Sequence, residues 1–117
     1  MFNFEKLKVW HKSIALADLT YGLTKSFSPD ERFGLTSQMR RAAVSIASNI
    51  AEGCSRDTKT DFRRFIEIAT GSAFELSSQT IIPRNQGLLT EDAQQQIYSA
   101  TLEIVRMLSG LRDALGD

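Results

Sequence analysis

Residues Gly34–Gly53 read GLTSQMRRAAVSIASNIAEG, a run with the periodicity of one amphipathic helix. At about 100° per residue, six apolar side chains fall on one face of such a helix. They are Leu35, Met39, Ala42, Ala43, Ile46 and Ile50. The opposite face carries Arg41, Ser45, Ser48 and Glu52. The pattern predicts a helix from Thr36 to Glu52, with Gly53 as its C-terminal cap.

The sequence on either side predicts three more helices, because it contains only two prolines and few β-branched runs. The first is expected from about Leu7 to Ser26. The third is expected to start at a threonine cap, either Thr58 or Thr60, and to run to about Asn85. Pro83 is expected to kink or end the last turn of this helix, because proline has no amide donor.

The last helix is expected to begin after Thr90, because a threonine followed by two acidic residues suits the positive end of the helix dipole. Four helices with short connections predict an all-α fold, the antiparallel up-down-up-down four-helix bundle. The 117 residues are expected to form one domain, residues 1–117. A chain of this length buries roughly two-thirds of its unfolded surface, so its stability requires no disulfide or metal.

Apolar stripes predict the inner faces of the first, third and last helices. The first helix has two candidate stripes on opposite sides. One consists of Leu7, Trp10, Ile14, Ala17 and Tyr21, and the other of Val9, Leu16, Leu19 and Leu23. The third helix has the stripe Phe62, Phe65, Ile66, Ala69, Ala73, Leu76 and Thr80. The last helix has the stripe Ala93, Ile97, Ala100, Ile104, Met107, Leu108, Leu111 and Leu115.

The chain has more large apolar residues than one inner stripe per helix requires. Those away from the expected stripes include Phe74, Ile81, Ile82, Tyr98, Leu102 and Val105. Burying a large apolar side chain is worth roughly 1.5–3 kcal/mol, so several left in water favour association. Two interpretations remain: the wide stripes serve a thick core, or these residues form the interface of a homo-oligomer. We predict the homo-oligomer.

Signatures of catalysis or cofactor binding are missing from the sequence. The single histidine, His11, and the single cysteine, Cys54, have no partners for a metal site or a catalytic pair. No glycine-rich nucleotide motif, nucleophile elbow or zinc-protease motif is present. Two carboxylates, Glu52 and Glu75, are expected on neighbouring helices.

We predict a protein that is not an enzyme and has no cofactor, metal or catalytic residue. The predicted structural polar network consists of Arg41, Ser45, Asn49, Glu52 and Glu75.

The cellular compartment is predicted from cysteine usage and from hydropathy. A lone cysteine cannot form an internal disulfide, which is typical of the reducing cytoplasm. The sequence has no run of 18 apolar residues, and its N-terminus lacks the apolar region of a signal peptide. We therefore expect a cytoplasmic protein with no membrane partner.

The 14 basic and 14 acidic residues cancel to a net charge of zero, but they are unevenly distributed. Residues 1–64 carry eleven basic and seven acidic side chains, a balance of +4, whereas residues 65–117 carry three and seven, a balance of −4. Basic residues cluster around the end of the second helix and the start of the third: Arg40, Arg41, Arg56, Lys59, Arg63 and Arg64. Such a cluster is able to hold phosphates, which predicts RNA or DNA binding. The alternative is a solvated face in which these cations pair with Asp57, Asp61 and Glu67.

Several motifs resemble those of a known family. They are Leu7-Lys8-Val9-Trp10, Gly34-Leu35-Thr36-Ser37-Gln38 with Arg40-Arg41-Ala42-Ala43, and Ser45-Ile46-x-Ser48-Asn49-Ile50-Ala51-Glu52-Gly53. The match continues through Phe62, Phe65, Ala69, Gly71-Ser72, Glu75-Leu76 and Gly87-Leu88-Leu89. Over nearly its whole length the chain resembles the four-helix-bundle proteins encoded in intervening sequences of bacterial 23S ribosomal RNA genes.

The resemblance implies an antiparallel four-helix bundle that assembles as a ring-like homopentamer and has no established enzymatic activity. It extends to the accessory protein of diversity-generating retroelements, a basic pentamer that binds nucleic acid and a reverse transcriptase. The chain departs from the family at Ala47, where proline is frequent, and in its net charge of zero.

Two hypotheses for function follow from the residues and the resemblance. The first is a non-enzymatic homo-oligomeric module, a pentamer by resemblance, that binds RNA or DNA through the basic residues. The alternative is a protein-interaction scaffold that binds a partner protein and has no role toward nucleic acid.

Overall fold

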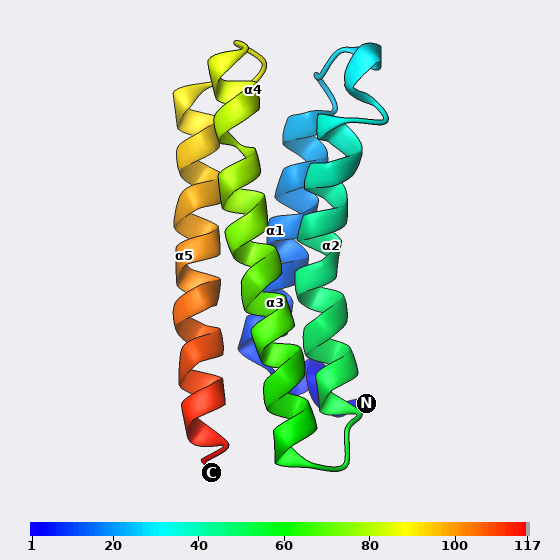
Figure 1. The fold of residues 1–117 in the computed structure, drawn as a ribbon, viewed down its shortest axis with the longest axis vertical. Helices are drawn as coiled ribbons and strands as arrows, with labels where there is room; N and C mark the ends of the chain where they lie inside the picture. The colour runs from blue at the N-terminus through cyan, green and yellow to red at the C-terminus, as the bar shows by residue number, and fades with distance from the viewer. Residues whose placement is uncertain (117) are drawn as a thin grey trace.

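The computed structural model describes residues 1–116, and these residues contain helices and connections but no strand. The four long helices are α1 (Lys8–Thr24), α2 (Leu35–Cys54), α3 (Lys59–Gln79) and α5 (Glu91–Ala114). Three short helices accompany them: the 3₁₀ helices η1 (Asn3–Lys6) and η2 (Pro29–Glu31), and the five-residue α4 (Ile81–Asn85). Figure 1 shows the long helices side by side, with η2 and α4 together at one end.

The long helices form a four-helix bundle that measures 45 × 21 × 21 Å. α1 packs against α2 and α5, and α3 packs against the same two helices, so the four form a square in cross-section. The chain reverses direction at each connection between long helices, as Figure 1 shows. The predicted fold, an antiparallel up-down-up-down bundle, is confirmed.

The predicted inner faces of α2 and α3 are largely correct. On α2 the residues Met39, Ala42, Ala43, Ile46 and Ile50 are buried, and on α3 the residues Ile66, Ala69, Ala73, Leu76 and Thr80 are buried. Leu35 and Phe62 are partly buried against this core. Small side chains on both helices allow close approach, and α2 and α3 form the most extensive helix contact in the bundle.

The inner face of α1 is the predicted second stripe, but hydroxyl side chains make up much of it. Val9 and Leu16 are buried, together with Ser13, Thr20 and Thr24. The three hydroxyls donate hydrogen bonds of 2.8, 2.8 and 2.7 Å to backbone carbonyls four residues earlier. A buried hydroxyl that is paired in this way avoids the desolvation cost of an unpaired one. The other candidate stripe of α1 is divided: Ile14 and Tyr21 are exposed. Leu7, Trp10 and Ala17 pack partly buried against the core.

Gly53 does not cap α2, contrary to the prediction. The helix continues to Cys54, and Ser55 is its C-cap residue. Gly53 is buried inside the helix, where a Cβ would lie 2.9 Å from the Cβ of Phe65 on α3. The glycine therefore provides space for α3 rather than a turn of the chain.

The third predicted helix is divided at Thr80 into α3 and α4. Pro83 causes the break, because its ring clashes with the carbonyl of Gln79, four residues earlier, and it has no N–H to donate to that carbonyl. The Pro83 carbonyl then accepts hydrogen bonds from Leu88 N at 2.9 Å and Leu89 N at 3.2 Å, which close the turn into α5.

Two threonines cap the long helices that follow them. Thr58 caps α3, because its Oγ1 accepts a hydrogen bond of 3.1 Å from Asp61 N. Thr60, the other candidate, lies inside α3. Thr90 caps α5 in the same way, with a bond of 3.1 Å from Ala93 N. Each cap satisfies one backbone amide that the first helical turn leaves without a partner.

Candidate nucleic-acid interface and apolar groove

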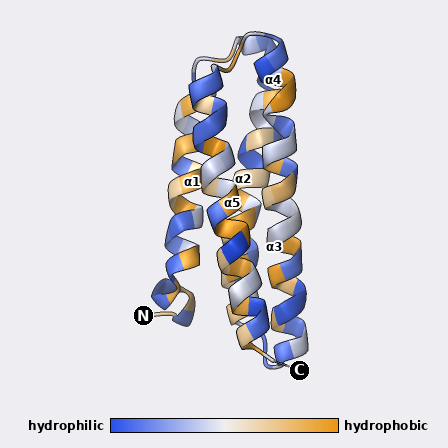
Figure 2. Cartoon of the chain, turned by 90° about the vertical axis from the view of Figure 1, so that its left-hand side faces the viewer, coloured by the Kyte–Doolittle hydropathy of each residue, from blue (hydrophilic) through white to orange (hydrophobic). Residues whose placement is uncertain are grey.

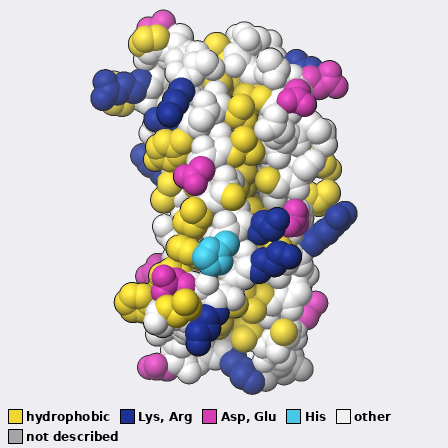
Figure 3. Space-filling view, turned by 180° about the vertical axis from the view of Figure 1, so that it is seen from behind, with side chains coloured by type: hydrophobic (Ala, Val, Ile, Leu, Met, Phe, Trp, Pro, Cys, Tyr) yellow, Lys and Arg dark blue, Asp and Glu magenta, His cyan; other side chains and the backbone are white. Residues whose placement is uncertain are grey.

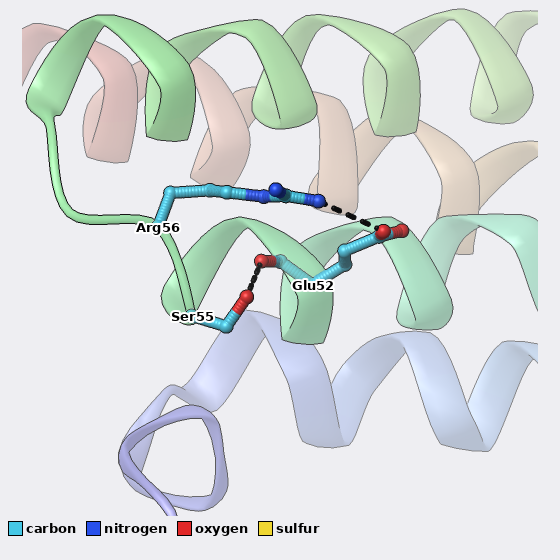
Figure 4. A network of polar contacts seen from close by, with 3 residues as sticks. All are labelled: Glu52, Ser55 and Arg56. Atoms are coloured by element: carbon cyan, nitrogen blue, oxygen red, sulfur yellow. Dashed lines mark hydrogen bonds and ion pairs between the residues drawn. The ribbon is translucent and has the colours of Figure 1, made fainter.

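Four of the six predicted phosphate-binding residues gather at the turn from α2 to α3. Arg56 is held in place on this turn, as Figure 4 shows. Its Nη2 lies 3.0 Å from Glu52 Oε1, and its guanidinium carbon lies 4.5 Å from the centre of the Phe65 ring. Ser55 Oγ also donates a 2.6 Å hydrogen bond to the backbone carbonyl of Glu52. The turn is thus braced by its own side chains.

The other three cations of this end form no salt bridge within residues 1–116. Lys59 and Arg64 are exposed and Arg63 is half-buried. The ion pairs found in this part of the chain join other residues, so the expected pairing of Arg63 with Glu67 is not formed. Lys59, Arg63 and Arg64, which we call the basic end, therefore keep their charges available to an anion.

Arg40 and Arg41 do not belong to this group, which corrects the predicted six-residue cluster. At about 1.5 Å per residue, Arg41 lies roughly 20 Å along α2 from its C-terminal end. Arg40 binds α1: its Nε donates to Thr24 Oγ1 at 2.9 Å, and its guanidinium lies 4.4 Å from the centre of the Tyr21 ring. The side chain of Arg40 thus joins two helices, and Arg41 is exposed beside it.

An aromatic cluster at the N-terminus is joined to the C-terminal end of α2, and sequence reasoning missed it. Asn3 Nδ2 donates a 2.9 Å hydrogen bond to the carbonyl of Cys54, which joins η1 to the end of α2. The rings of Phe2 and Phe4 are stacked with centres 5.6 Å apart, and Trp10 meets Phe4 edge-on at 4.8 Å. The alternation of aromatic and polar residues before Lys6 was the available signal.

The single histidine lies among basic side chains on the same face. Its Nε2 donates a 2.7 Å hydrogen bond to the carbonyl of Glu5, and its ring lies 5.0 Å from that of Trp10. Figure 3 shows the histidine with Lys and Arg side chains on one side and hydrophobic side chains on the other. Lys12, which follows His11 in the sequence, pairs with Glu103 at 3.2 Å. His11 thus holds η1 on α1.

The predicted polar network is smaller than expected. Ser45 and Ser72 join α2 to α3 through a 2.8 Å hydrogen bond between their hydroxyls. Asn49 Nδ2 donates to the Ser45 carbonyl at 2.8 Å and to Ser45 Oγ at 3.0 Å. Of the other predicted members, Glu52 pairs with Arg56 instead, and both Arg41 and Glu75 are exposed.

The carboxylates of Glu52 and Glu75, which were expected on neighbouring helices, lie far apart. With Ser45 opposite Ser72, the antiparallel register places Glu52 about ten residues from the level of Glu75, a separation of roughly 15 Å. No group of three or more His, Cys, Asp or Glu that could hold a metal ion is found among residues 1–116. Burial raises the pKa of the Cys54 thiol above its ordinary value, which keeps the sulfur protonated.

Five of the six predicted interface residues line one groove between α3 and α5. The groove has a volume of about 580 Å³, and its apolar lining includes Phe74, Ile81, Tyr98, Leu102 and Val105. Ile82 is exposed outside it on α4. Figure 2, with α5 in front, shows hydrophobic residues on α3 and α4 at its side. The thick-core interpretation fails for Phe74 and Tyr98, which are 64% and 50% exposed, whereas Val105 packs partly against the core.

The helices of the described residues are too short or too polar to cross a membrane.

The geometry defines the class of the protein: a small helical bundle with a basic end and an apolar side groove. The chain belongs to the family of the 23S rRNA-intervening sequence protein, whose model it matches over residues 5–110. The family resemblance of the sequence motifs is thereby confirmed.

A solved structure has the same fold. It is the crystal structure of a protein of unknown function from the S23 ribosomal protein family of Bacteroides thetaiotaomicron. The two chains are 24% identical and superpose with a TM-score of 0.82, over 89% of this chain and 97% of the other. A comparison with the curated proteins found no significant match.

Proposed function

We propose that the chain is a non-enzymatic, homo-oligomeric bundle that binds RNA or DNA at its basic end. The observation that carries this proposal is the group Lys59, Arg63 and Arg64, whose charges lie together at one turn without carboxylate partners in residues 1–116. Unpaired surface cations bind phosphates and release the counterions that surround nucleic acid.

The neighbouring rings add a second property that suits a nucleic acid. Phe2 is 73% exposed and is stacked on Phe4, so one face of the pair is open to a base. Stacking of a base on an aromatic side chain is worth roughly 1–3 kcal/mol and tolerates any base. The Asn3 bond to Cys54 holds η1, and with it these rings, at the C-terminal end of α2.

Assembly compensates for the small charge of one chain. Each copy contributes only a few free cations, and a homopentamer, the state that the family resemblance implies, repeats them five times. Sites that are linked in this way bind one long polyanion with an avidity above that of a single site.

A second candidate function is a scaffold that binds a partner protein. The division of charge favours it, because the balance of +4 over residues 1–64 and −4 over residues 65–117 gives the bundle two surfaces of opposite sign. Such surfaces recognise proteins of complementary charge.

Fluorescence anisotropy with labelled RNA and DNA oligonucleotides tests the proposal. We expect binding at 50 mM salt that weakens steeply at 200 mM. The double variant R63E/R64E is expected to lower affinity at least tenfold. The matched control K25E/R106E changes the net charge equally at exposed positions away from the basic end, and it should lower affinity less than threefold. Absence of salt-sensitive binding, or equal loss in both variants, would contradict the proposal and favour the scaffold.

A further inference from the structure

No residue among 1–116 fills the groove between α3 and α5. Its walls include Phe74 and Tyr98, which are half-exposed or more, above the less exposed Leu102 and Val105. Apolar side chains left in water in this way favour burial against a second surface. An apolar hollow of this size, with a charged rim, is typical of a binding surface.

The opposite side of the bundle presents a projecting aromatic ring. Phe33 follows η2 and is 87% exposed, the highest value among the large hydrophobic residues after Met1. The guanidinium carbon of Arg32 lies 5.3 Å from the centre of this ring. Tyr21 and Val44 border the same surface and are also exposed. Phe33 therefore contributes almost no burial to the fold of its own chain.

The groove and Phe33 lie at the same end of the bundle on opposite sides. Figure 1 shows η2 and α4 at this end, with α1 and α2 on one side and α3 and α5 on the other. Because both surfaces lie toward this end, a neighbour with its long axis parallel to the first has its Phe33 at the same end as the groove.

The charges around the two surfaces are complementary. Arg32 and Arg41 lie beside Phe33. At the rim of the groove Glu91 pairs with Arg84 at 3.8 Å. The carboxylate near the groove that is left without an ion pair within residues 1–116 is therefore Glu75, which follows Phe74 in the sequence. Opposite charges at the edges of an apolar contact fix the orientation of the partners and suppress wrong pairings.

We infer that Phe33 of one copy occupies the α3–α5 groove of a second copy of this chain. The inference rests on the proposed homo-oligomer and specifies the surfaces that form it. We call the exposed Phe33 side chain the knob. The knob and the groove are different surfaces of one chain, so each copy offers one of each and the contact between copies is head-to-tail. Repetition of a head-to-tail contact closes a ring when the rotation between copies divides a full turn.

Light scattering after size-exclusion chromatography tests this inference with two variants and their mixture. F33D removes the knob, and Y98D places a charge in the groove; both positions are exposed, so both chains are expected to fold. F74D is a second groove variant, and F2D, at another exposed phenylalanine, is the control. Circular dichroism verifies that each variant keeps its helix content.

The expected masses differ for each sample. Wild type and F2D are assembled, and F33D, Y98D and F74D each have the mass of one chain. An equimolar mixture of F33D with Y98D forms a complex of two chains, because the knob of Y98D still fits the groove of F33D. The complex does not grow beyond two chains. The surfaces that remain free are the substituted position 33 of F33D and the substituted groove of Y98D, and neither can bind a third chain.

Three results would overturn the inference, and they are distinguishable. An F33D variant that assembles like wild type while Y98D dissociates shows a groove-to-groove contact, and the homo-oligomer stands. A mixture that stays at the mass of one chain shows that Phe33 and Tyr98 do not face each other, and again the homo-oligomer stands. Wild type at the mass of one chain removes the homo-oligomer as well.

Discussion

Gly53 of α2 and Phe65 of α3 approach so closely that a methyl group at Gly53 would lie 2.9 Å from the Phe65 Cβ. Phe62 Cδ1 lies 3.1 Å from the same point, so two aromatic residues of the neighbouring helix occupy the space that a side chain at position 53 would need. Gly53 precedes the turn that carries Arg56, and the Arg56 guanidinium lies over the ring of Phe65. The position of α3, and with it the position of the basic end, depends on this contact.

Gly53→Ala is expected to destabilise the protein. The inserted methyl overpacks the contact at a cost of roughly 1–3 kcal/mol, which exceeds the gain of about 1 kcal/mol in helix propensity. Gly71→Ala is the matched control: it lies in α3 with nothing within 4 Å of an added Cβ, so we expect a gain of roughly 0.5–1 kcal/mol. Urea unfolding followed by circular dichroism measures both. Equal effects of the two substitutions would contradict the packing role of Gly53.

Thr58→Ala and Thr60→Ala are expected to change stability in opposite directions. Thr58 accepts the Asp61 amide hydrogen bond that caps α3, and its loss costs about 1 kcal/mol. Thr60 lies exposed in the first turn of α3, where alanine is the better helix former by a few tenths of a kcal/mol. Thermal unfolding of the two variants checks the sign. Destabilisation by Thr60→Ala alone would show that the cap is assigned wrongly.

Arg40→Met and Arg41→Met separate a structural arginine from a solvent-exposed one. Arg40 loses its hydrogen bond to Thr24 and its stacking on Tyr21, which together stabilise the fold by about 1–2 kcal/mol. Arg41 is exposed, so its replacement is expected to change stability by less than about 0.5 kcal/mol. Chemical denaturation provides the comparison, and a larger effect at Arg41 would refute the assignment.

Cys54 is expected to make stability fall at alkaline pH. Burial raises the pKa of its thiol in the folded state, so the folded protein holds this proton more tightly than the unfolded chain does. The contribution is present below the pKa of the unfolded thiol and is lost as pH rises through the folded one. The urea midpoint of wild type should therefore fall relative to that of Cys54→Ala as pH rises from 7 to 10.5.

The same pKa shift predicts slow modification of the thiol. Only the thiolate reacts with iodoacetamide, so alkylation at pH 8 should be several-fold slower in the folded protein than in urea. Equal rates in the two states, or urea midpoints that stay parallel with pH, would show that Cys54 is not desolvated.

The fold was predictable because α2 and α3 obey one simple rule. Their inner residues are apolar and recur with helical spacing, as in Met39, Ile46 and Ile50, so periodicity alone identifies the buried face. α1 breaks the rule with Thr20 and Thr24, whose polarity is cancelled by bonds to their own helix. Such internal compensation leaves no trace in a hydropathy pattern.

The candidate site was predictable only in part, because proximity in sequence differs from proximity in a long helix. Arg41 and Arg56 are near each other in the chain, yet about two-thirds of α2 lies between them. Asn3 and Cys54 are 51 residues apart, and a hydrogen bond joins them. Five of the six predicted interface residues line the groove, since an outward apolar residue is visible from the helical period even before its neighbours are known. Their role in an interface stays a prediction.

The hydroxyls on the inner face of α1 also bear on how the molecule opens. Ser13, Thr20 and Thr24 donate only to carbonyls of α1, so these bonds survive when that helix swings away from the other three. A form in which α1 is detached therefore leaves none of these hydroxyls without a partner, and the cost of opening lies in the apolar side chains that α1 exposes.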